Sequence, residues 1–139
     1  MVDGNVSGVF RTWLRDKYRH AREVLAESAG PVDPWSLVVR DLMVHGIHSI
    51  LTVDRDADGT VRFSGQDLGV PAGLVSNDTE YEYFRTIRPR RVPQLVELLG
   101  GRPGDELRDL LGLEWADGRS FELEKRLGQA PFPIEFVSC

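Results

Sequence analysis

The hexapeptide DRDADG, residues 54–59, separates two runs that have the composition of β-strands, Ile47–Val53 and Thr60–Ser64. Asp-Gly between two such runs is a strong hairpin signal, because Asp caps its own turn and Gly adopts a positive φ without steric cost. A hairpin here requires the two runs to be antiparallel neighbours. This prediction constrains the fold more than any other feature of the sequence.

The same hexapeptide matches the first half of a calcium-binding loop, with Asp54, Asp56 and Asp58 at alternate positions before a glycine. Such a loop needs a bidentate glutamate at its twelfth position and an oxygen ligand at its ninth. Those positions are Gly65 and Arg62, so the spacing favours a turn. A weak calcium site at the three aspartates is the alternative.

Along the rest of the chain the expected strands and helices come in blocks of one kind and do not alternate strictly. The run WSLVVRDLMV follows Asp33-Pro34, a typical N-cap and first helical position, which predicts a short helix to about His45. A buried strand is the alternative, because the run is largely apolar. The other expected elements are an N-terminal amphipathic helix over Val9–Ala26, a strand over Glu80–Ile87, helices from Val92, Asp105 and Ser120, and a final strand over Phe132–Val137.

Blocks of strands and helices indicate an α+β protein with a mostly antiparallel sheet of about four strands and helices on one face. The 139 residues predict a single domain, with residues 1–46 as an N-terminal helical segment and 47–139 as sheet and helices. The one cysteine, Cys139, cannot form an internal disulfide, which favours a reducing compartment. Because no run is apolar enough for a leader or a membrane span, we expect a soluble cytoplasmic protein.

Catalytic and metal signals are weak in this sequence. No phosphate-binding loop, nucleophile elbow or dinucleotide fingerprint is present, and we expect neither a metal nor a cofactor. His45 and His48 lie at an expected junction between elements, with no cysteine nearby to complete a zinc site. A small enzyme that uses Asp67 with Glu80 or Glu82 is an alternative, because paired carboxylates support acid–base chemistry; a non-catalytic protein is the main hypothesis.

The strand EYEYFRTI is the most unusual local feature. Its alternation places Tyr81, Tyr83 and Arg85 on one face and Glu80 and Glu82 on the other. Tyrosine and arginine are frequent anchors of protein interfaces, and carboxylates steer basic partners. The candidate partner-binding residues are Asp67, Glu80, Tyr81, Glu82, Tyr83 and Arg85. The opposing interpretation is that the tyrosines complete the core and the acids face water.

A basic cluster near Pro89 offers a different function. Arg85, Arg88, Arg90 and Arg91 lie at the start of an expected helix, where an anion or a nucleic acid is a conceivable ligand. The formal net charge of −5 argues against non-specific binding of nucleic acid, which needs a basic face. A regulatory or nucleic-acid-binding module is therefore the alternative to a protein-binding domain.

The order of motifs across residues 47–139 resembles that of small uncharacterised actinomycete proteins. The resemblance is carried by GQDLG, EYEYFRTI, VPQLVELLGG, PGDELRDLL and PIEFVSC. Some members of that group resemble immunity proteins encoded beside polymorphic toxins. This resemblance implies a protein that binds and neutralises a toxin domain, often a basic one, through an acidic and aromatic surface. It implies no catalytic residues.

Overall fold

The computed structural model describes residues 32–69 and 80–138, and these residues form one antiparallel sheet with a layer of helices. The strands are β1 Trp35–Val44, β2 Ile47–Arg55, β3 Val61–Leu68, β4 Glu80–Ile87 and β5 Glu135–Ser138. The helices are α2 Val92–Leu98, α3 Leu107–Glu114 and α4 Ser120–Gly128, with short 3-10 turns η1 Pro89–Arg91 and η2 Asp117–Arg119. The strands lie in the order β1-β2-β3-β4-β5, so each strand pairs with its neighbours in sequence.

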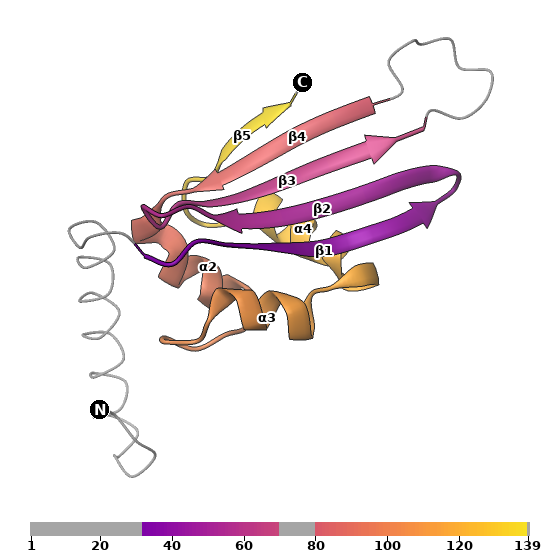
Figure 1. Cartoon of the computed structure of the whole chain (residues 1–139). Coiled ribbons are helices and arrows are strands. Elements are labelled where there is room, and N and C mark those ends of the chain that lie inside the picture. The colour runs from indigo at the N-terminus through magenta and orange to yellow at the C-terminus, as the bar shows by residue number, and fades with distance from the viewer. Residues whose placement is uncertain (1–31, 70–79, 139) are drawn as a thin grey trace.

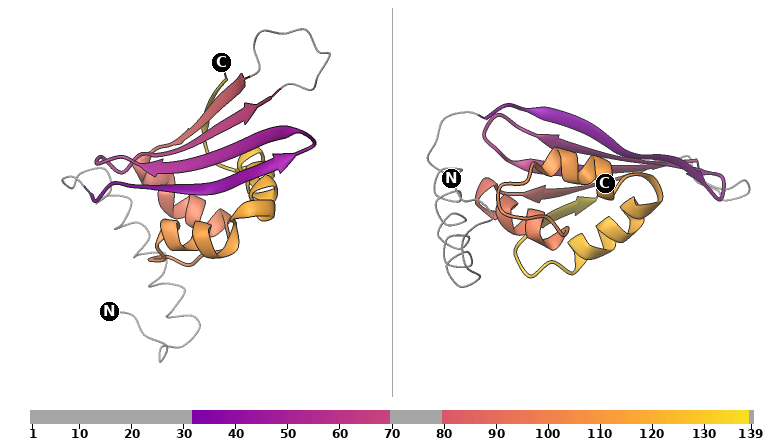
Figure 2. Two further views of the ribbon diagram at one scale, coloured as in Figure 1. Left: turned by 45° about the vertical axis from the view of Figure 1, so that its right-hand side comes forward. Right: turned by 90° about the horizontal axis from the view of Figure 1, so that it is seen from below.

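The three helices cover one face of the sheet and leave the other uncovered by any described residue (Figures 1 and 2). We call the helix-covered face the inner face and the other the outer face. The predicted α+β class and the position of the helices are confirmed, and the sheet has five described strands instead of about four. The expected helix over residues 9–26 lies outside the described residues.

The prediction of a helix over Asp33–His45 is wrong, and the alternative of a strand is correct. Trp35–Val44 forms β1, which pairs with β2 along its whole length. His45 and Gly46 join the two strands with φ values of 51° and 81°. Positive φ at both central residues is the geometry of a type I′ turn, whose twist matches that of a hairpin. Gly46 therefore closes a hairpin instead of ending a helix.

The hairpin predicted from DRDADG is confirmed between β2 and β3. The amide of Asp56 donates to the carbonyl of Thr60 at 2.9 Å, and Gly59 has a φ of 92°. The Asp58 carboxylate accepts a hydrogen bond from the Thr60 amide at 2.9 Å, and this bond lowers the pKa of Asp58. Asp58 thus caps the turn, and among the described residues no group of three acidic, histidine or cysteine side chains is placed to hold a metal ion.

A β-bulge in β1 decides which side chains of that strand enter the protein. Val38 pairs with Thr52 and Arg40 with Leu51, which leaves Val39 as the additional residue. Consecutive side chains of a regular strand point to opposite faces, but a bulge can aim two successive ones the same way. Val39 and Arg40 are accordingly both buried, at 1% and 2% exposure.

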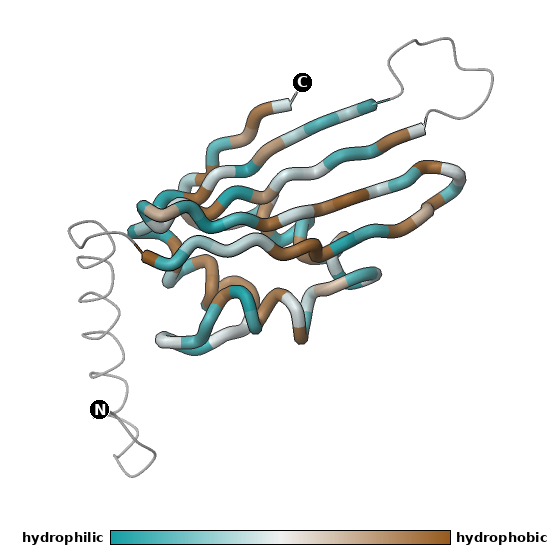
Figure 3. Tube along the Cα trace, in the orientation of Figure 1, coloured by the Kyte–Doolittle hydropathy of each residue, from teal (hydrophilic) through white to brown (hydrophobic). Residues whose placement is uncertain are grey.

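The core lies between the inner face and the helices, and Figure 3 shows the alternation of hydrophobic and hydrophilic residues along the strands that produces it. The fully or almost fully buried residues of the sheet include Leu51, Val53, Val61, Phe63 and Ile87, and those of the helices include Leu95, Leu111, Leu123 and Leu127. Trp115 joins the helices by donating its indole N–H to the carbonyl of Leu99 at 2.9 Å. Among the described residues, no helix is long and apolar enough to cross a membrane.

Candidate functional site

A buried polar network occupies the inner face between the sheet and α4. It consists of Arg40, Ser49, Tyr83, Ser120 and Glu124, joined at its margins by Asp67 and Arg85. Arg40, Ser49 and Tyr83 come from β1, β2 and β4, and α4 supplies Ser120 and Glu124. The network therefore connects both layers of the protein.

Arg40 is the centre of this network and is 2% exposed. Its Nη2 lies 2.7 Å from Oε1 of Glu124, which forms an ion pair. Its other nitrogens donate to Oγ of Ser49 at 3.0 Å and to Oγ of Ser120 at 3.1 Å. A buried guanidinium is tolerated only when its charge and its several donors are matched in this way.

Glu124 forms ion pairs with two arginines and accepts a hydrogen bond from one phenol. Its Oε2 accepts a hydrogen bond from Arg85 at 2.8 Å, and its Oε1 accepts one from the Tyr83 hydroxyl at 2.8 Å. Burial raises the pKa of Tyr83, and the hydrogen bond to the Glu124 carboxylate raises it further. Tyr83 therefore remains a neutral hydrogen-bond donor well above the pH at which a free tyrosine ionises.

Gly65 makes room for the Tyr83 ring. The two residues are direct partners across β3 and β4. A Cβ atom at residue 65 would lie 2.0 Å from Cζ of Tyr83, well inside van der Waals contact. The missing side chain of Gly65 thus allows the tyrosine to lie flat over β3 and to reach Arg40 and Glu124.

Partly exposed aromatic rings surround the network. Tyr81, Phe121 and Phe136 are 46%, 44% and 52% exposed. The Tyr83 ring centroid lies 5.6 Å from that of Tyr81 and 6.1 Å from that of Phe136. The guanidinium of Arg40 lies 4.2 Å from the centroid of Phe121, a cation–π distance. This arrangement makes the margin of the network an aromatic surface.

The outer face combines apolar and acidic side chains. One cross-strand row contains only uncharged residues: Val38, Thr52, Ser64, Phe84 and Val137. Val38 and Val137, at its two ends, are 57% and 58% exposed. Acidic side chains occupy the neighbouring rows: Asp41, Asp54, Glu80, Glu82 and Glu135. Arg62 is the basic residue among these rows, and His48 is hydrogen-bonded to Asp41 at 2.5 Å.

Glu80 and Glu82 form a like-charged pair on this face. The side-chain amide of Gln66 donates to Glu80 at 2.5 Å and to Glu82 at 3.4 Å. A hydrogen bond between the two carboxyl groups raises the pKa of Glu82, and repulsion by Glu80 raises it further. The same hydrogen bond lowers the pKa of Glu80. The two carboxyl groups therefore titrate at different pH values, with Glu80 the first to ionise.

The predicted partner-binding residues are divided between the two faces. Asp67, Tyr81, Tyr83 and Arg85 belong to the inner face, and Glu80 and Glu82 belong to the outer face. Tyr83 is buried in the polar network, as the core interpretation of the tyrosines expected, whereas Tyr81 is not buried. No single flat surface contains all six residues.

The predicted arginine cluster does not form one patch. Arg85 is bound to Glu124 on the inner face. Arg88 pairs with Glu135 at 3.0 Å, and Arg91 donates to Gln94 at 2.9 Å. Arg90 lies with Arg91 in η1. Since at least two of the four cations already have carboxylate partners, an anion site here has little structural support.

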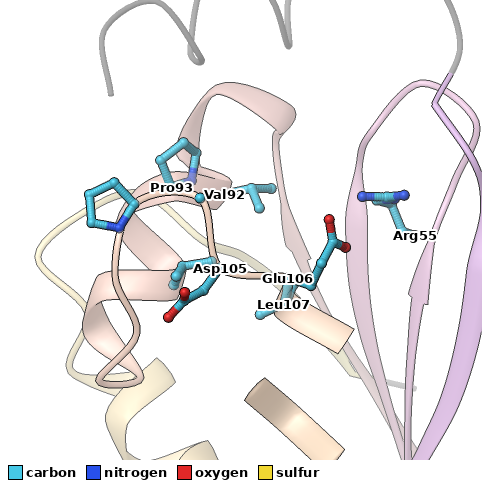
Figure 4. Close-up of a pocket in the computed structure, with 9 residues that line it drawn as sticks. Arg55, Val92, Pro93, Asp105, Glu106 and Leu107 are labelled. Atoms are coloured by element: carbon cyan, nitrogen blue, oxygen red, sulfur yellow. The ribbon is translucent and has the colours of Figure 1, made fainter. Parts of the chain in front are cut away.

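The carboxylates considered for catalysis are also kept apart. In the register of β3 and β4, Asp67 lies opposite Tyr81 and Gln66 lies opposite Glu82. The side chains of Asp67 and Glu82 therefore point to opposite faces of the sheet. Asp67 accepts a hydrogen bond from Ser49 at 2.7 Å. A small pocket of about 40 Å³ lies elsewhere, with Arg55, Val92, Pro93 and Glu106 in its wall (Figure 4). It contains none of the residues predicted for a site.

Sequence reasoning missed Arg40, Ser49, Ser120 and Glu124. Arg40 carried one usable signal, because it interrupts the apolar run LVVRDLMV. A charged residue inside such a run is either at an exposed position or buried with a partner. The identity of that partner depends on the tertiary fold, since Glu124 lies on a helix far along the chain.

The fold and the network define a class of protein, an α+β domain built on an antiparallel meander with one helix layer. No family model, no curated protein and no solved structure matches the chain.

Replacing Gly65 with alanine should lower the free energy of unfolding by about 2 kcal/mol, because overpacking a core displaces its neighbours. Chemical denaturation would measure the change. Gly118→Ala is the matched control, since a Cβ there meets nothing within 4 Å. An equal loss in both variants would contradict the proposed contact with Tyr83.

Glu124→Gln should lower the free energy of unfolding by about 3 kcal/mol, because it leaves the buried guanidinium of Arg40 without a counter-charge. Glu122→Gln provides the control on the same helix, where the side chain is exposed. Denaturant titration of both variants at neutral pH would give the difference. Equal stability of the two variants would show that the ion pair contributes nothing.

The raised pKa of Tyr83 should make the protein less stable in alkali. Above about pH 10 an unfolded tyrosine ionises while the folded one resists, so the unfolded state gains stability as pH rises. Tyr83→Phe should reduce this decline in denaturation experiments across alkaline pH. Tyr81→Phe on the same strand is the control, and an equal effect of both changes would argue against the assignment.

Proposed function

We propose that this protein is a non-catalytic binding domain whose outer sheet face binds a basic protein surface. The observation that carries the proposal is the absence of any described helix over that face, although it bears exposed valines and a partly exposed phenylalanine. A partner that covers this face would bury the apolar row from Val38 to Val137. Burial of such a row is the main source of affinity in protein interfaces.

Charge determines which kind of partner fits. The outer face carries five carboxylates and one arginine in its cross-strand rows, and Arg88, just after β4, pairs with one of the five, Glu135. The face therefore keeps an acidic excess, and the whole chain has a net charge of −5. A basic surface would be attracted to this face over distance and would approach in the correct orientation. A second acidic protein, or a nucleic acid, would be repelled.

The Glu80–Glu82 pair is the strongest recognition feature of the face. Two ionised carboxylates on neighbouring positions of one face repel each other, and a lysine or arginine placed between them would relieve this repulsion. Such a cation favours both carboxylates in the charged form. Affinity for a basic partner should therefore increase as pH rises through the pKa of Glu82.

A toxin domain is the partner that the resemblance to actinomycete immunity proteins suggests. An inhibitor of this kind needs no catalytic group and acts by covering a site on its target. The polar network suits that role, because it ties side chains of three strands to α4, and a pre-organised surface loses less entropy on binding. The dispersed arginines and the separated carboxylates give the nucleic-acid and enzyme alternatives less support.

Replacing Glu80 and Glu82 together with lysine should slow association with a basic partner by about 10- to 100-fold at low salt, because it removes electrostatic steering. The partner would first be captured with tagged protein and identified by mass spectrometry. Surface plasmon resonance at several salt concentrations would then give the rates.

Glu114→Lys with Glu122→Lys is the control, since it changes the net charge equally at exposed helical positions. Circular dichroism would establish that both variants are folded. If the control slows association as strongly as the outer-face variant, net charge alone governs binding and the proposed face is wrong. If neither variant changes the rate, the partner binds elsewhere.

A further inference from the structure

At its beginning, strand β4 has one edge that pairs with no other described strand. Strand β5 pairs with Tyr83–Thr86, and its last described residue, Ser138, lies opposite Tyr83. The preceding segment Glu80–Glu82 pairs with β3 on one side and with no described strand on the other. Figure 1 shows β4 extending past the end of β5. The backbone groups of an open edge are available to pair with an extended peptide.

We propose that an extended basic segment of the partner adds a strand along Glu80–Glu82, next to the end of β5. This inference rests on the proposed binding of a basic protein and specifies how that protein is held. Strand addition supplies affinity through main-chain hydrogen bonds and specificity through alternate side chains.

The geometry of the edge explains why the candidate residues lie on two faces. Glu80 and Glu82 point to the outer face, and Tyr81 points to the inner face, where its ring packs 5.6 Å from that of Tyr83. A ligand that lies on one face alone reaches either the two glutamates or the tyrosine. A ligand along the edge reaches both, because its own side chains alternate in the same way.

The side chains of β4 also define the sequence pattern of the added strand. Directly opposed side chains of antiparallel strands lie about 5 Å apart at Cβ. Residues opposite Glu80 and Glu82 are therefore basic, and the residue opposite Tyr81 is apolar. The pattern is basic, apolar, basic.

A second copy of this chain is a poor occupant of the edge. Antiparallel pairing centred on Tyr81 would place Glu80 of each copy opposite Glu82 of the other. Like charges directly opposed across strands are destabilising. The two carboxylates thus disfavour self-association and leave the edge selective for a basic strand.

A short peptide of alternating valine and lysine, with blocked ends, is the probe for this proposal. NMR titration of the amide chemical shifts would give its affinity and its position. An isomer with the same residues in two blocks is the matched control. We expect the alternating peptide to bind at least about tenfold more tightly. We also expect the peptide to slow amide exchange at those residues of Glu80–Glu82 whose N–H groups point to the edge, and Glu80→Gln with Glu82→Gln to weaken its binding.

Backbone methylation separates strand addition from simple charge attraction. Only alternate residues of an added strand donate hydrogen bonds to the edge. One peptide is N-methylated at its odd-numbered residues and a second at its even-numbered residues. Methylation should abolish affinity in the peptide whose hydrogen-bonding amides are blocked and leave it unchanged in the other. Retention by both, loss by both, or equal binding of the alternating and block isomers would overturn strand addition.

These outcomes are distinct from a failure of the proposed function. A partner that remains sensitive to Glu80→Lys with Glu82→Lys, while both methylated peptides bind, would still use the outer face without adding a strand. A partner insensitive to that change would remove the proposed face itself.

Discussion

The ion pair between Arg40 and Glu124 is the interaction on which this structure depends. It joins the first described strand to the last helix, and its members also bind side chains of β2 and β4. A guanidinium at 2% exposure is stable only if several partners converge on it. The bulge at Val39 and the missing side chain of Gly65 both serve this convergence. The first turns Arg40 inward, and the second lets Tyr83 reach it.

The sequence predicted those elements whose pattern is set locally. The Asp58-Gly59 turn, the strand Glu80–Ile87 and the helices that begin near Val92 and Ser120 all appear where expected. Their signals are turn chemistry, proline and glycine placement, and regular spacing of apolar residues, which do not depend on distant parts of the chain.

The errors have identifiable physical causes. The bulge in β1 places Val38, Val39 and Arg40 out of the two-residue alternation that marks a strand, and Pro34 imitates the start of a helix. Alternation in EYEYFRTI correctly separated Tyr81 and Glu82 onto opposite faces, whereas the role of these residues in binding stays a prediction. The buried pairing of Arg40 with Glu124 could not be predicted, since it depends on how α4 packs on the sheet.

The order of the strands has a consequence for how the chain folds. Every strand pairs with its neighbours in sequence, so β1 to β3 can form through two successive hairpins with short loops. Contacts between residues close in sequence form quickly because little chain entropy is lost in closing the loops. Arg40 and Ser120, in contrast, are 80 positions apart. We therefore expect the sheet to assemble first and the charged network to form after the transition state of folding. Changes in the network should then alter the rate of unfolding more than the rate of folding.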